Sequence, residues 1–251
     1  MKKENILISG GAGNIGSALV NRLVQSGRYH VVILDNLTTG SLRKLPNEFK
    51  DSWSFIKGDV NKKSDISEVM LSRQFDYVYH YAAMVGVQRT QDNPVAVLRD
   101  IEGIKNILDL AKNTGVKRII YSSSSEVYGE PVHIPQNEIH TPLNSRVPYA
   151  VVKNVGESFL RSYHQEYGLN YSIYRFFNTY GPNQSKDFVI AKFLSAALKN
   201  EAITIYGDGS QSRTFCYIDD NIDVTVKCLE EELLVQLMEF EGYFHCLDSL
   251  N

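Results

Sequence analysis

The chain has 251 residues, of which 43% are hydrophobic and 22% charged, which suits one large or two closely associated globular domains. Its net charge of −3 excludes the strongly basic field that nucleic-acid binding requires. The three cysteines, Cys216, Cys228 and Cys246, lie far apart, which argues against a disulfide scaffold or a zinc site and favours a reducing, cytoplasmic location. No apolar run reaches the roughly 18 residues of a membrane span, so we expect no membrane partner.

Short apolar runs alternate with longer amphipathic stretches along most of the chain. The short runs predict strands at Ile6–Ser9, Val31–Asp35, Trp53–Lys57, Tyr77–Tyr81, Arg118–Ser122 and Tyr171–Phe176. The amphipathic stretches predict helices at Ile15–Ser26, Asp65–Ser72, Pro94–Asn113 and Pro148–Tyr167. Because strands and helices alternate, the sequence indicates an α/β fold with a doubly wound parallel sheet that helices cover on both faces.

After about residue 177 the pattern changes to Gly-Pro, Gly-Asp-Gly-Ser and short mixed segments. We expect a second, smaller region here, placed over the carboxyl edge of the sheet. Leucines and a methionine within Glu230–Phe240 predict a helix in the core or at an interface.

A glycine-rich loop follows the first predicted strand and opens the first predicted helix. Gly10, Gly13 and Gly16 have the spacing G-x-x-G-x-x-G, and Gly11 adds the overlapping pattern G-x-G-x-x-G. Glycine allows the backbone to approach a pyrophosphate at a helix N-terminus. Asp35 ends the second strand about 20 residues later, where a carboxylate can bind both hydroxyls of an adenosine ribose and repels a 2′-phosphate. The strand, loop, helix, strand and Asp in this order predict an NAD site.

Tyr149 and Lys153 form a Tyr-x-x-x-Lys pair directly after Pro148, at the expected start of a helix. At this spacing both side chains share one helix face, where the lysine cation and the helix N-terminus favour the phenolate and lower the pKa of the tyrosine. Such a tyrosine suits a general base that removes a hydroxyl proton while hydride leaves the same carbon. The spacing alone has little specificity, and its place after a serine-rich strand end gives it weight.

That strand end runs from Ser122 through Ser125 to Glu126. Hydroxyls at the carboxyl end of a strand lie at the rim where ligands bind in doubly wound folds. A serine there can hydrogen-bond a hydroxyl that is being oxidised and the carbonyl that it becomes. The alternative is a polar strand exit with solvated serines.

Together these motifs resemble the extended short-chain dehydrogenase/reductase family, specifically its NAD-dependent nucleotide-sugar epimerases, dehydratases and decarboxylases, with UDP-glucose 4-epimerases among them. The resemblance is carried by Gly10–Gly16, Leu34–Leu37, Gly58–Val60, His80–Ala83, Ser122–Gly129, Pro148–Lys153, Arg175–Pro182 and Gly207–Asp220. It implies a Rossmann domain for NAD at residues 1–176, to which about 214–235 return. It also implies a smaller substrate-binding region at 177–213 and 236–251, which we expect to be truncated because relatives continue for several more elements.

The resemblance also assigns roles to individual residues. It implies that Ser124, Tyr149 and Lys153 are catalytic, and that a nucleotide sugar, in most relatives a UDP-sugar, contacts Ser124, Asn178 and Arg213. It implies NAD binding by Gly10, Gly13, Asn14, Ile15, Gly16, Asp35, Asn36, Asp59, Val60, Ala82, Ala83, Tyr149 and Lys153. The implied chemistry is oxidation of the sugar at C4, after which NAD is regenerated and stays bound. A homodimer is expected by analogy, and no metal is expected.

Two departures leave the reaction open. Sugar 4,6-dehydratases carry an Asp-Glu pair where this chain has Ser125 and Glu126, which speaks against a dehydratase. The sequence Ser124-Ser125-Glu126 resembles UDP-glucuronate decarboxylases, in which a 4-ketone produces a β-keto acid that readily loses carbon dioxide. We therefore expect a 4-epimerase. The alternatives are a decarboxylase that uses Glu126 or a 4,6-dehydratase-type enzyme of the same family, and a non-catalytic NAD-binding protein is the alternative of another class. Asp100 stands where relatives usually have Asn, and its carboxylate is either neutralised by Lys153 or weakens the site.

Overall fold

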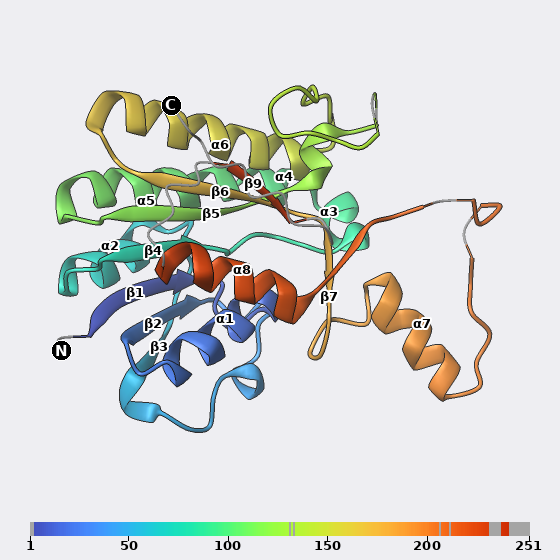
Figure 1. Cartoon of the computed structure of the whole chain (residues 1–251), viewed down its shortest axis with the longest axis horizontal. Helices are drawn as coiled ribbons and strands as arrows, with labels where there is room; N and C mark the ends of the chain where they lie inside the picture. The colour runs from blue at the N-terminus through green and yellow to red at the C-terminus, as the bar shows by residue number, and fades with distance from the viewer. Residues whose placement is uncertain are drawn as a thin grey trace.

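The computed structural model describes residues 3–130, 132, 134–205, 207–210, 212–230 and 237–240. Its main sheet has seven parallel strands in the order β3-β2-β1-β4-β5-β6-β9 (Figure 1). A second, two-stranded parallel sheet pairs β7 with β8. The strands are β1 (Glu4–Ser9), β2 (Tyr29–Asp35), β3 (Trp53–Lys57), β4 (Tyr77–His80), β5 (Arg118–Ser124), β6 (Tyr171–Phe176), β7 (Asn178–Tyr180), β8 (Phe215–Tyr217) and β9 (Leu237–Phe240). The predicted doubly wound α/β fold is confirmed.

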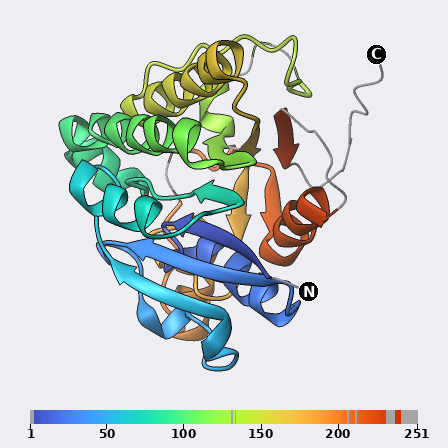
Figure 2. The ribbon, with the colours of Figure 1, turned by 90° about the vertical axis from the view of Figure 1, so that its left-hand side faces the viewer.

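Helices cover both faces of the main sheet (Figure 2). On one face α1 (Asn14–Gln25) packs beside α8 (Ile218–Glu230). On the other face lie α2 (Lys63–Ser72), α5 (Asp100–Thr114) and α6 (Pro148–Tyr167), with α5 between the other two. The short helices α3 (Val87–Asp92) and α4 (Pro94–Leu98) precede α5, and α7 (Val189–Leu198) lies between β7 and β8 in the chain. Among the described residues, no helix is long and apolar enough to cross a membrane.

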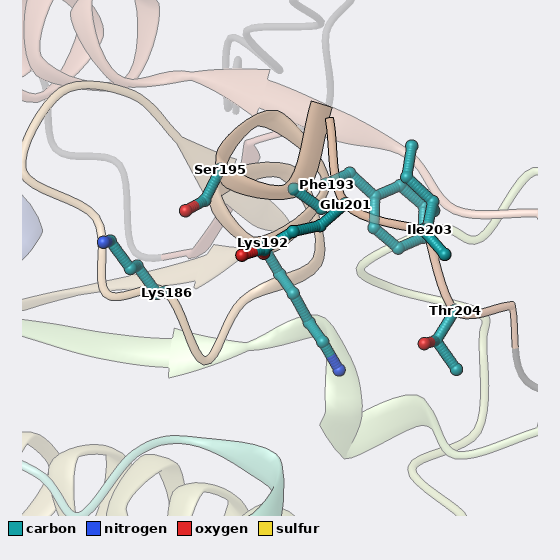
Figure 3. A pocket seen from close by; sticks show the side chains of 9 residues that line it. Lys186, Lys192, Phe193, Ser195, Glu201, Ile203 and Thr204 are labelled. Carbon is teal, nitrogen blue, oxygen red and sulfur yellow. The ribbon is translucent and has the colours of Figure 1, made fainter. Parts of the chain in front are cut away.

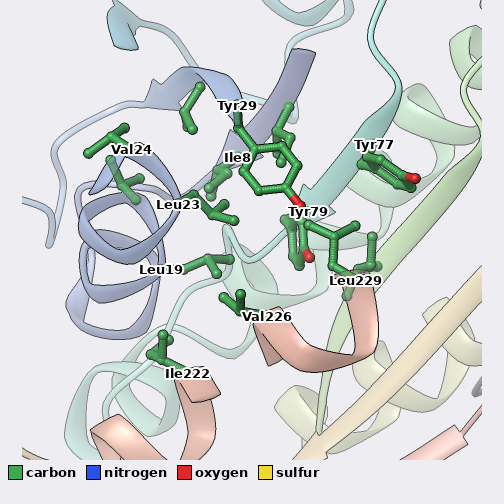
Figure 4. Packing of buried hydrophobic residues seen from close by; sticks show 14 of the residues in the cluster. Ile8, Leu19, Leu23, Val24, Tyr29, Tyr77, Tyr79, Ile222, Val226 and Leu229 are labelled. Carbon is green, nitrogen blue, oxygen red and sulfur yellow. The ribbon is translucent and has the colours of Figure 1, made fainter. Parts of the chain in front are cut away.

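The strands are apolar without interruption because both of their faces are buried. In β1, Ile6 and Ile8 pack with α1 and α8, whereas Leu7 between them packs with α2, α5 and α6. Figure 4 shows the first of these two clusters, in which Leu19 of α1 and Val226 of α8 meet near Ile8. Burial of one such side chain contributes about 1.5–3 kcal/mol, so two layers of this kind hold the carboxyl ends of the strands in fixed positions.

The structure divides one predicted helix into two. The sequence indicates a single helix at Pro94–Asn113, but α4 ends at Leu98 and α5 begins at Asp100. Between them the amide of Arg99 donates to the carbonyl of Ala96, three residues back, at 3.2 Å, so the regular ladder of four-residue hydrogen bonds is interrupted there.

The predicted helix within Glu230–Phe240 is wrong over residues 237–240, because β9 pairs there with β6 as a parallel strand. Short apolar runs are compatible with a buried strand or a buried helix, and periodicity does not distinguish them. β9 extends the main sheet, whereas the sequence analysis assigned residues 236–251 to the smaller region. The rest of that assignment, residues 236 and 241–251, lies outside the described residues.

Candidate active site

The strand order reverses between β1 and β4, and the carboxyl ends of these two strands form the crevice in which doubly wound sheets bind ligands. Gly10 leaves β1 at this point with a φ of +75°, and a Cβ on it would lie 2.6 Å from the amide nitrogen of Ala82. The glycine loop therefore lies directly against the chain that leaves β4. Below it, Ser9 Oγ and His80 Nδ1 are 2.8 Å apart and join the two strand ends.

The first turn of α1 is open to an anion. A Cβ on Gly16 would overlap the carbonyl oxygen of Gly10, and a Cβ on Gly13 would lie 3.1 Å from the same oxygen. No side chain of the described residues caps the start of α1, so its first amide groups are available as donors. Asn14 Oδ1 is buried without a hydrogen-bond partner among the described residues. A tight backbone cradle with uncapped amides and an unsatisfied polar atom fits the pyrophosphate of a dinucleotide.

Asp35 ends β2 beside this loop and is 8% exposed. Its Oδ2 accepts a hydrogen bond from the amide of Ala12 at 3.0 Å, and its Oδ1 accepts one from the amide of Leu37 at 2.8 Å. A carboxylate keeps further lone pairs after two such bonds, so it can still accept bonds from hydroxyl groups. Asn36 is exposed next to it, and its Oδ1 accepts from the amide of Thr38. The role of Asp35 at an adenosine ribose and the cofactor contact of Asn36 stay predictions.

The other predicted cofactor residues follow β3 and β4 along the same edge of the sheet. Asp59 Oδ1 accepts from the amide of Asn61 at 3.0 Å, and the carbonyl of the buried Val60 accepts from Asn106 Nδ2 at 3.1 Å. Ala82 and Ala83 are half-buried where the chain leaves β4. The structure thus gathers the predicted cofactor residues at the ends of four adjacent strands.

Ser124, Tyr149 and Lys153 come together at the carboxyl end of β5. Ser124 closes this strand, and Tyr149 is the second residue of α6, where Pro148 starts the helix. The hydroxyl of Ser124 lies close enough to the phenol of Tyr149 to lower the pKa of that phenol by hydrogen bonding. Lys153 is 3% exposed, and its Nζ donates to the carbonyl of Ser122 at 2.5 Å and lies 5.7 Å from the ring centroid of Tyr149. The helix spacing therefore delivers both side chains to the serine-rich strand end.

The phenol of Tyr149 corrects an expectation from the sequence. The Tyr-x-x-x-Lys spacing predicts a lowered pKa, but burial raises the pKa of Tyr149 to about 12, and the charges of Glu126 and Asp100 act in the same direction. The hydrogen bond from Ser124 opposes this rise. The expectation was wrong because spacing reports the neighbours on one helix but not the desolvation that the rest of the fold imposes.

Asp100 is the first residue of α5, and its carboxylate connects the segments that follow β4 and β3. Its Oδ2 accepts from the amide of Met84 at 2.6 Å, and its Oδ1 accepts from Asn61 Nδ2 at 3.0 Å. Burial lowers the pKa of Lys153 to about 8, and the charge of Asp100 opposes that decrease. The carboxylate is thus stabilised by two neutral donors and helps in turn to keep Lys153 cationic.

The remaining predicted site residues are the catalytic candidate Glu126 and the substrate-binding candidates Asn178 and Arg213. Glu126 is exposed near Tyr149, since its charge raises the pKa of that phenol. Asn178 is exposed at the start of β7, and its Nδ2 donates to the carbonyl of Thr214 at 2.9 Å. Arg213 is exposed beside Thr214, just before β8. The structure therefore brings Asn178 and Arg213 to the same two-stranded sheet, and their contacts with a substrate stay a prediction.

Three features of the structure escaped the sequence analysis. His80 is buried and stacked on Tyr121, and burial together with the charge of Lys153 lowers its pKa to about 3, so it is a neutral hydrogen-bonding group. Glu157 and Arg175 form a buried ion pair behind Ser124, for which the only sequence signal is a glutamate one helical turn after Lys153. A hollow between α7 and the segment after it combines cationic and apolar side chains (Figure 3); it is lined by Lys186, Lys192, Phe193, Ser195, Ala196, Glu201, Ala202, Ile203 and Thr204.

Comparison with known proteins shows which proteins this chain is similar to. A putative UDP-glucose 4-epimerase of Methanocaldococcus jannaschii is 38% identical over 221 residues, which cover 86% of this chain and 70% of that protein. UDP-glucuronic acid decarboxylase 3 of Arabidopsis thaliana is 37% identical over 232 residues, which cover 90% of this chain and 66% of that protein. A solved UDP-N-acetylglucosamine 4-epimerase from Methanobrevibacter ruminantium M1, in complex with UDP-N-acetylmuramic acid, superposes with a TM-score of 0.87 at 34% identity and covers 96% of this chain and 77% of that one.

The chain thus spans from 66% to 77% of the length of these three proteins. The model of a family described as the NAD dependent epimerase/dehydratase family matches residues 6–235, which is nearly the whole described chain. The chain belongs to this family of NAD-dependent enzymes, as its resemblance implied.

Proposed function

We propose that the chain is a nucleotide-sugar 4-epimerase that acts on a UDP-sugar through a transient 4-keto sugar. The proposal depends above all on the contact of Ser124 and Tyr149 beside the buried Lys153 at the end of β5. The relative from M. jannaschii, which is named a putative UDP-glucose 4-epimerase, supports the same reading.

The glycine loop, Asn14 and Asp35 would hold NAD, the loop and Asn14 at the pyrophosphate and Asp35 at the adenosine ribose. When bound, NAD accepts the hydride that leaves C4 of the sugar and later returns it. Lys153 would add a hydrogen bond to the cofactor, because its ammonium lies near the carboxyl end of β5, on the same edge of the sheet as the loop after β1. These assignments agree with the uncapped start of α1 and with the unsatisfied Oδ1 of Asn14.

The proton chemistry belongs to Tyr149. Its Oη would take the proton of the C4 hydroxyl during oxidation and give it back to the carbonyl oxygen during reduction, so one residue serves as base and then as acid. Ser124 donates towards Oη, and the ammonium of Lys153 lies beside the ring, so both favour the phenolate that burial disfavours. Inversion at C4 then requires only that the ketone present its other face before hydride returns.

A UDP-glucuronate decarboxylase is the second candidate, and Glu126 favours it. This carboxylate is exposed near Tyr149 and follows Ser124 and Ser125, in the order that those decarboxylases present. The A. thaliana relative, which is named a UDP-glucuronic acid decarboxylase, supports this candidate. Both candidates share the oxidation at C4 and differ only in the fate of the ketone.

The discriminating experiment is incubation of the protein and NAD with UDP-glucuronate, UDP-glucose and UDP-N-acetylglucosamine in parallel, followed by mass spectrometry and proton NMR. An unchanged mass with inverted C4 supports the epimerase. Loss of carbon dioxide from UDP-glucuronate supports the decarboxylase. If the three sugars remain untouched while NAD binds with ordinary affinity, both candidates are contradicted for these substrates and the non-catalytic alternative gains support.

A homodimer is part of this proposal. Val95 and Leu98 of α4 and Val151 of α6 expose 68%, 42% and 37% of their surfaces, and these two helices pack against each other. An apolar surface of this kind suits a second copy of the chain. Light scattering should report twice the mass of one chain, and a stable monomer at micromolar concentration would contradict this part of the proposal.

A further inference from the structure

One carboxylate behind the candidate active site collects hydrogen bonds from three elements. Glu157 of α6 is fully buried, and its Oε1 accepts from Ser123 Oγ of β5 at 2.6 Å and from Arg175 Nε of β6 at 2.9 Å. Its Oε2 accepts from the second guanidinium nitrogen of Arg175 at 2.7 Å and from Arg161 at 2.9 Å. The carboxylate therefore links the catalytic helix to both strands beneath it, over which α6 lies in Figure 1.

The negative charge of Glu157 is compensated by the two guanidinium groups that contact it. Burial alone would raise the pKa of Glu157, but the hydrogen bond and charge of Arg175, together with Ser123, lower it below its ordinary value. The side chain is thus an ionised carboxylate whose two oxygens are both occupied. A buried ion pair of this kind has little freedom to rearrange, since loss of one partner leaves the other charged and unsolvated.

Arg175 extends the network to the segment that carries Glu126. It is 1% exposed, and its NH1 donates to the hydroxyl of Tyr128 at 2.7 Å. Its guanidinium also lies 4.9 Å from the ring centroid of Tyr128. Tyr128 closes the single 3₁₀ turn that starts at Ser125, so this hydrogen bond connects the ion pair to the turn after Ser124.

The network sits directly behind the catalytic contact. Ser123 precedes Ser124, and Glu157 follows Tyr149 and Lys153 at intervals of four residues, on the same helix face. At Gly156 the helix approaches β5 closely, because a Cβ there would lie 2.5 Å from the Tyr121 ring. The distance between α6 and the serine-rich strand end is therefore set by two features. Gly156 has no side chain and allows the close approach, and the ion pair of Glu157 holds it.

We propose that Glu157 and Arg175 are positioning residues, which hold Ser124 against the phenol of Tyr149 by fixing β5, α6 and β6 relative to one another. This inference rests on the proposed function for its effect on turnover. Its structural content, that the Ser124–Tyr149 contact depends on the ion pair, can be tested without any substrate.

A Glu157→Gln change has two possible effects on the pKa of Tyr149, and they have opposite signs, so the direction of the shift distinguishes them. Removal of a negative charge near a phenol by itself lowers the phenol pKa. Displacement of Ser124 removes a hydrogen bond that lowers the pKa of Tyr149, so it raises that pKa. A positioning role therefore predicts an upward shift, and a direct electrostatic role predicts a downward one.

The experiment compares the parent with Glu157→Gln and Ser123→Ala, each labelled biosynthetically with fluorotyrosine, which titrates at a pH that the fold tolerates. Fluorine NMR follows the Tyr149 resonance, which is identified by its loss in Tyr149→Phe. Ser123→Ala removes one hydroxyl and keeps the ion pair, so it tests the link to Ser124 even if Glu157→Gln does not fold. Tyr163→Phe is the control, since it removes a different α6 hydrogen bond, the one to Asp109 at 2.6 Å.

We expect the Tyr149 resonance to titrate at a higher pH in both network variants and to stay unchanged in Tyr163→Phe. With a sugar substrate, we expect kcat to fall about 10- to 100-fold while KM and NAD affinity stay within twofold, because a small misplacement of a catalytic group has effects of this size. A downward shift, or an unchanged titration with only a lower melting temperature, would overturn the inference. A parent protein without turnover would contradict the proposed function alone, since the titration still decides the positioning role.

Discussion

Single residues around Tyr149 set the proton chemistry, and Tyr149 itself gives the most direct test. Tyr149→Phe keeps the ring but removes the group that would carry the C4 proton. We expect kcat to fall by about 100- to 10,000-fold, the usual contribution of general acid–base catalysis, with NAD binding unchanged. Steady-state kinetics and NAD titration check this. A variant that turned over sugar nucleotide as fast as the parent would refute the assignment.

The carboxylate of Asp100 gives a prediction for pH dependence. Its charge raises the pKa values of both Lys153 and Tyr149. Asp100→Asn therefore lowers both: Lys153 loses its proton below about pH 8, and the phenol of Tyr149 ionises more easily. We expect the whole activity profile to move to lower pH, measured as kcat/KM against pH.

The matched control is Glu102→Gln, which removes another carboxylate from the first turn of α5. Glu102 is exposed and lies 4.0 Å from Lys105, so its charge is screened by solvent. Its profile should match that of the parent. If Asp100→Asn shifted the profile to higher pH, the charge of Asp100 would not act on this pair as described.

At the residue scale the sequence predicted which residues form the site better than it predicted their burial and contacts. Tyr149 and Lys153 were found from spacing and position, Ser124 was singled out by the family resemblance, and the structure brings the three together. The raised pKa of Tyr149 was missed, because desolvation depends on every element packed around the phenol. The ion pair of Glu157 with Arg175 was also missed. Glu157 lies on a helix and Arg175 on the next strand, and no local sequence pattern indicates that two such residues are in contact.

At the scale of elements, the glycine loop makes a matched pair of substitutions available. Gly10 and Gly27 have φ values of +75° and +71°, so alanine is strained at both. A Cβ at Gly10 would lie 2.6 Å from Ala82 N, whereas a Cβ at Gly27 meets nothing within 4 Å. Strain of this kind costs about 1–2 kcal/mol at either position, and only Gly10→Ala adds a collision with the backbone.

We therefore expect Gly27→Ala to lower the melting temperature slightly and to bind NAD as the parent does. Gly10→Ala should weaken NAD binding by about 100-fold or more, because the loop must move away from the crevice. Calorimetric titration with NAD measures both. Equal NAD affinity in the two variants would show that the close approach to Ala82 is not needed for the site.

Elements were predictable where periodicity and length agreed. Trp53–Lys57, Tyr171–Phe176 and Pro148–Tyr167 have the bounds that the sequence indicated. The interruption at Arg99 was not predictable, since the amphipathic pattern continues through it. β9 was mistaken for a helix because its four residues reveal their type only through pairing with β6.

At the scale of the whole molecule, α8 joins the carboxyl-terminal half of the chain to the Rossmann sheet. Its inner face is apolar, with Ile222 2% exposed in the cluster that α1 shares. Its outer face is polar, and Asp223 pairs there with Arg22 of α1, both about half exposed. The apolar face should therefore hold the two parts together, because exposed ion pairs contribute little.

Ile222→Ala should destabilise the protein by about 2–5 kcal/mol, the usual range for a buried large-to-small change. Arg22→Gln should cost about 0–1 kcal/mol. Denaturant unfolding of both variants at constant pH and salt measures the difference. Equal losses in the two variants would mean that α8 is held by its charges instead.

The start of α1 has a consequence for how quickly the protein is degraded in the cell. Among the described residues no side chain caps this helix start and Asn14 Oδ1 has no partner, so a bound dinucleotide would add hydrogen bonds there that the protein does not supply itself. A ligand that forms them binds only the native state, which adds about 2.7 kcal/mol at a concentration one hundredfold above its dissociation constant. Newly made copies without the dinucleotide would thus open more often and meet proteases sooner. Cellular levels of the protein would follow the supply of its cofactor.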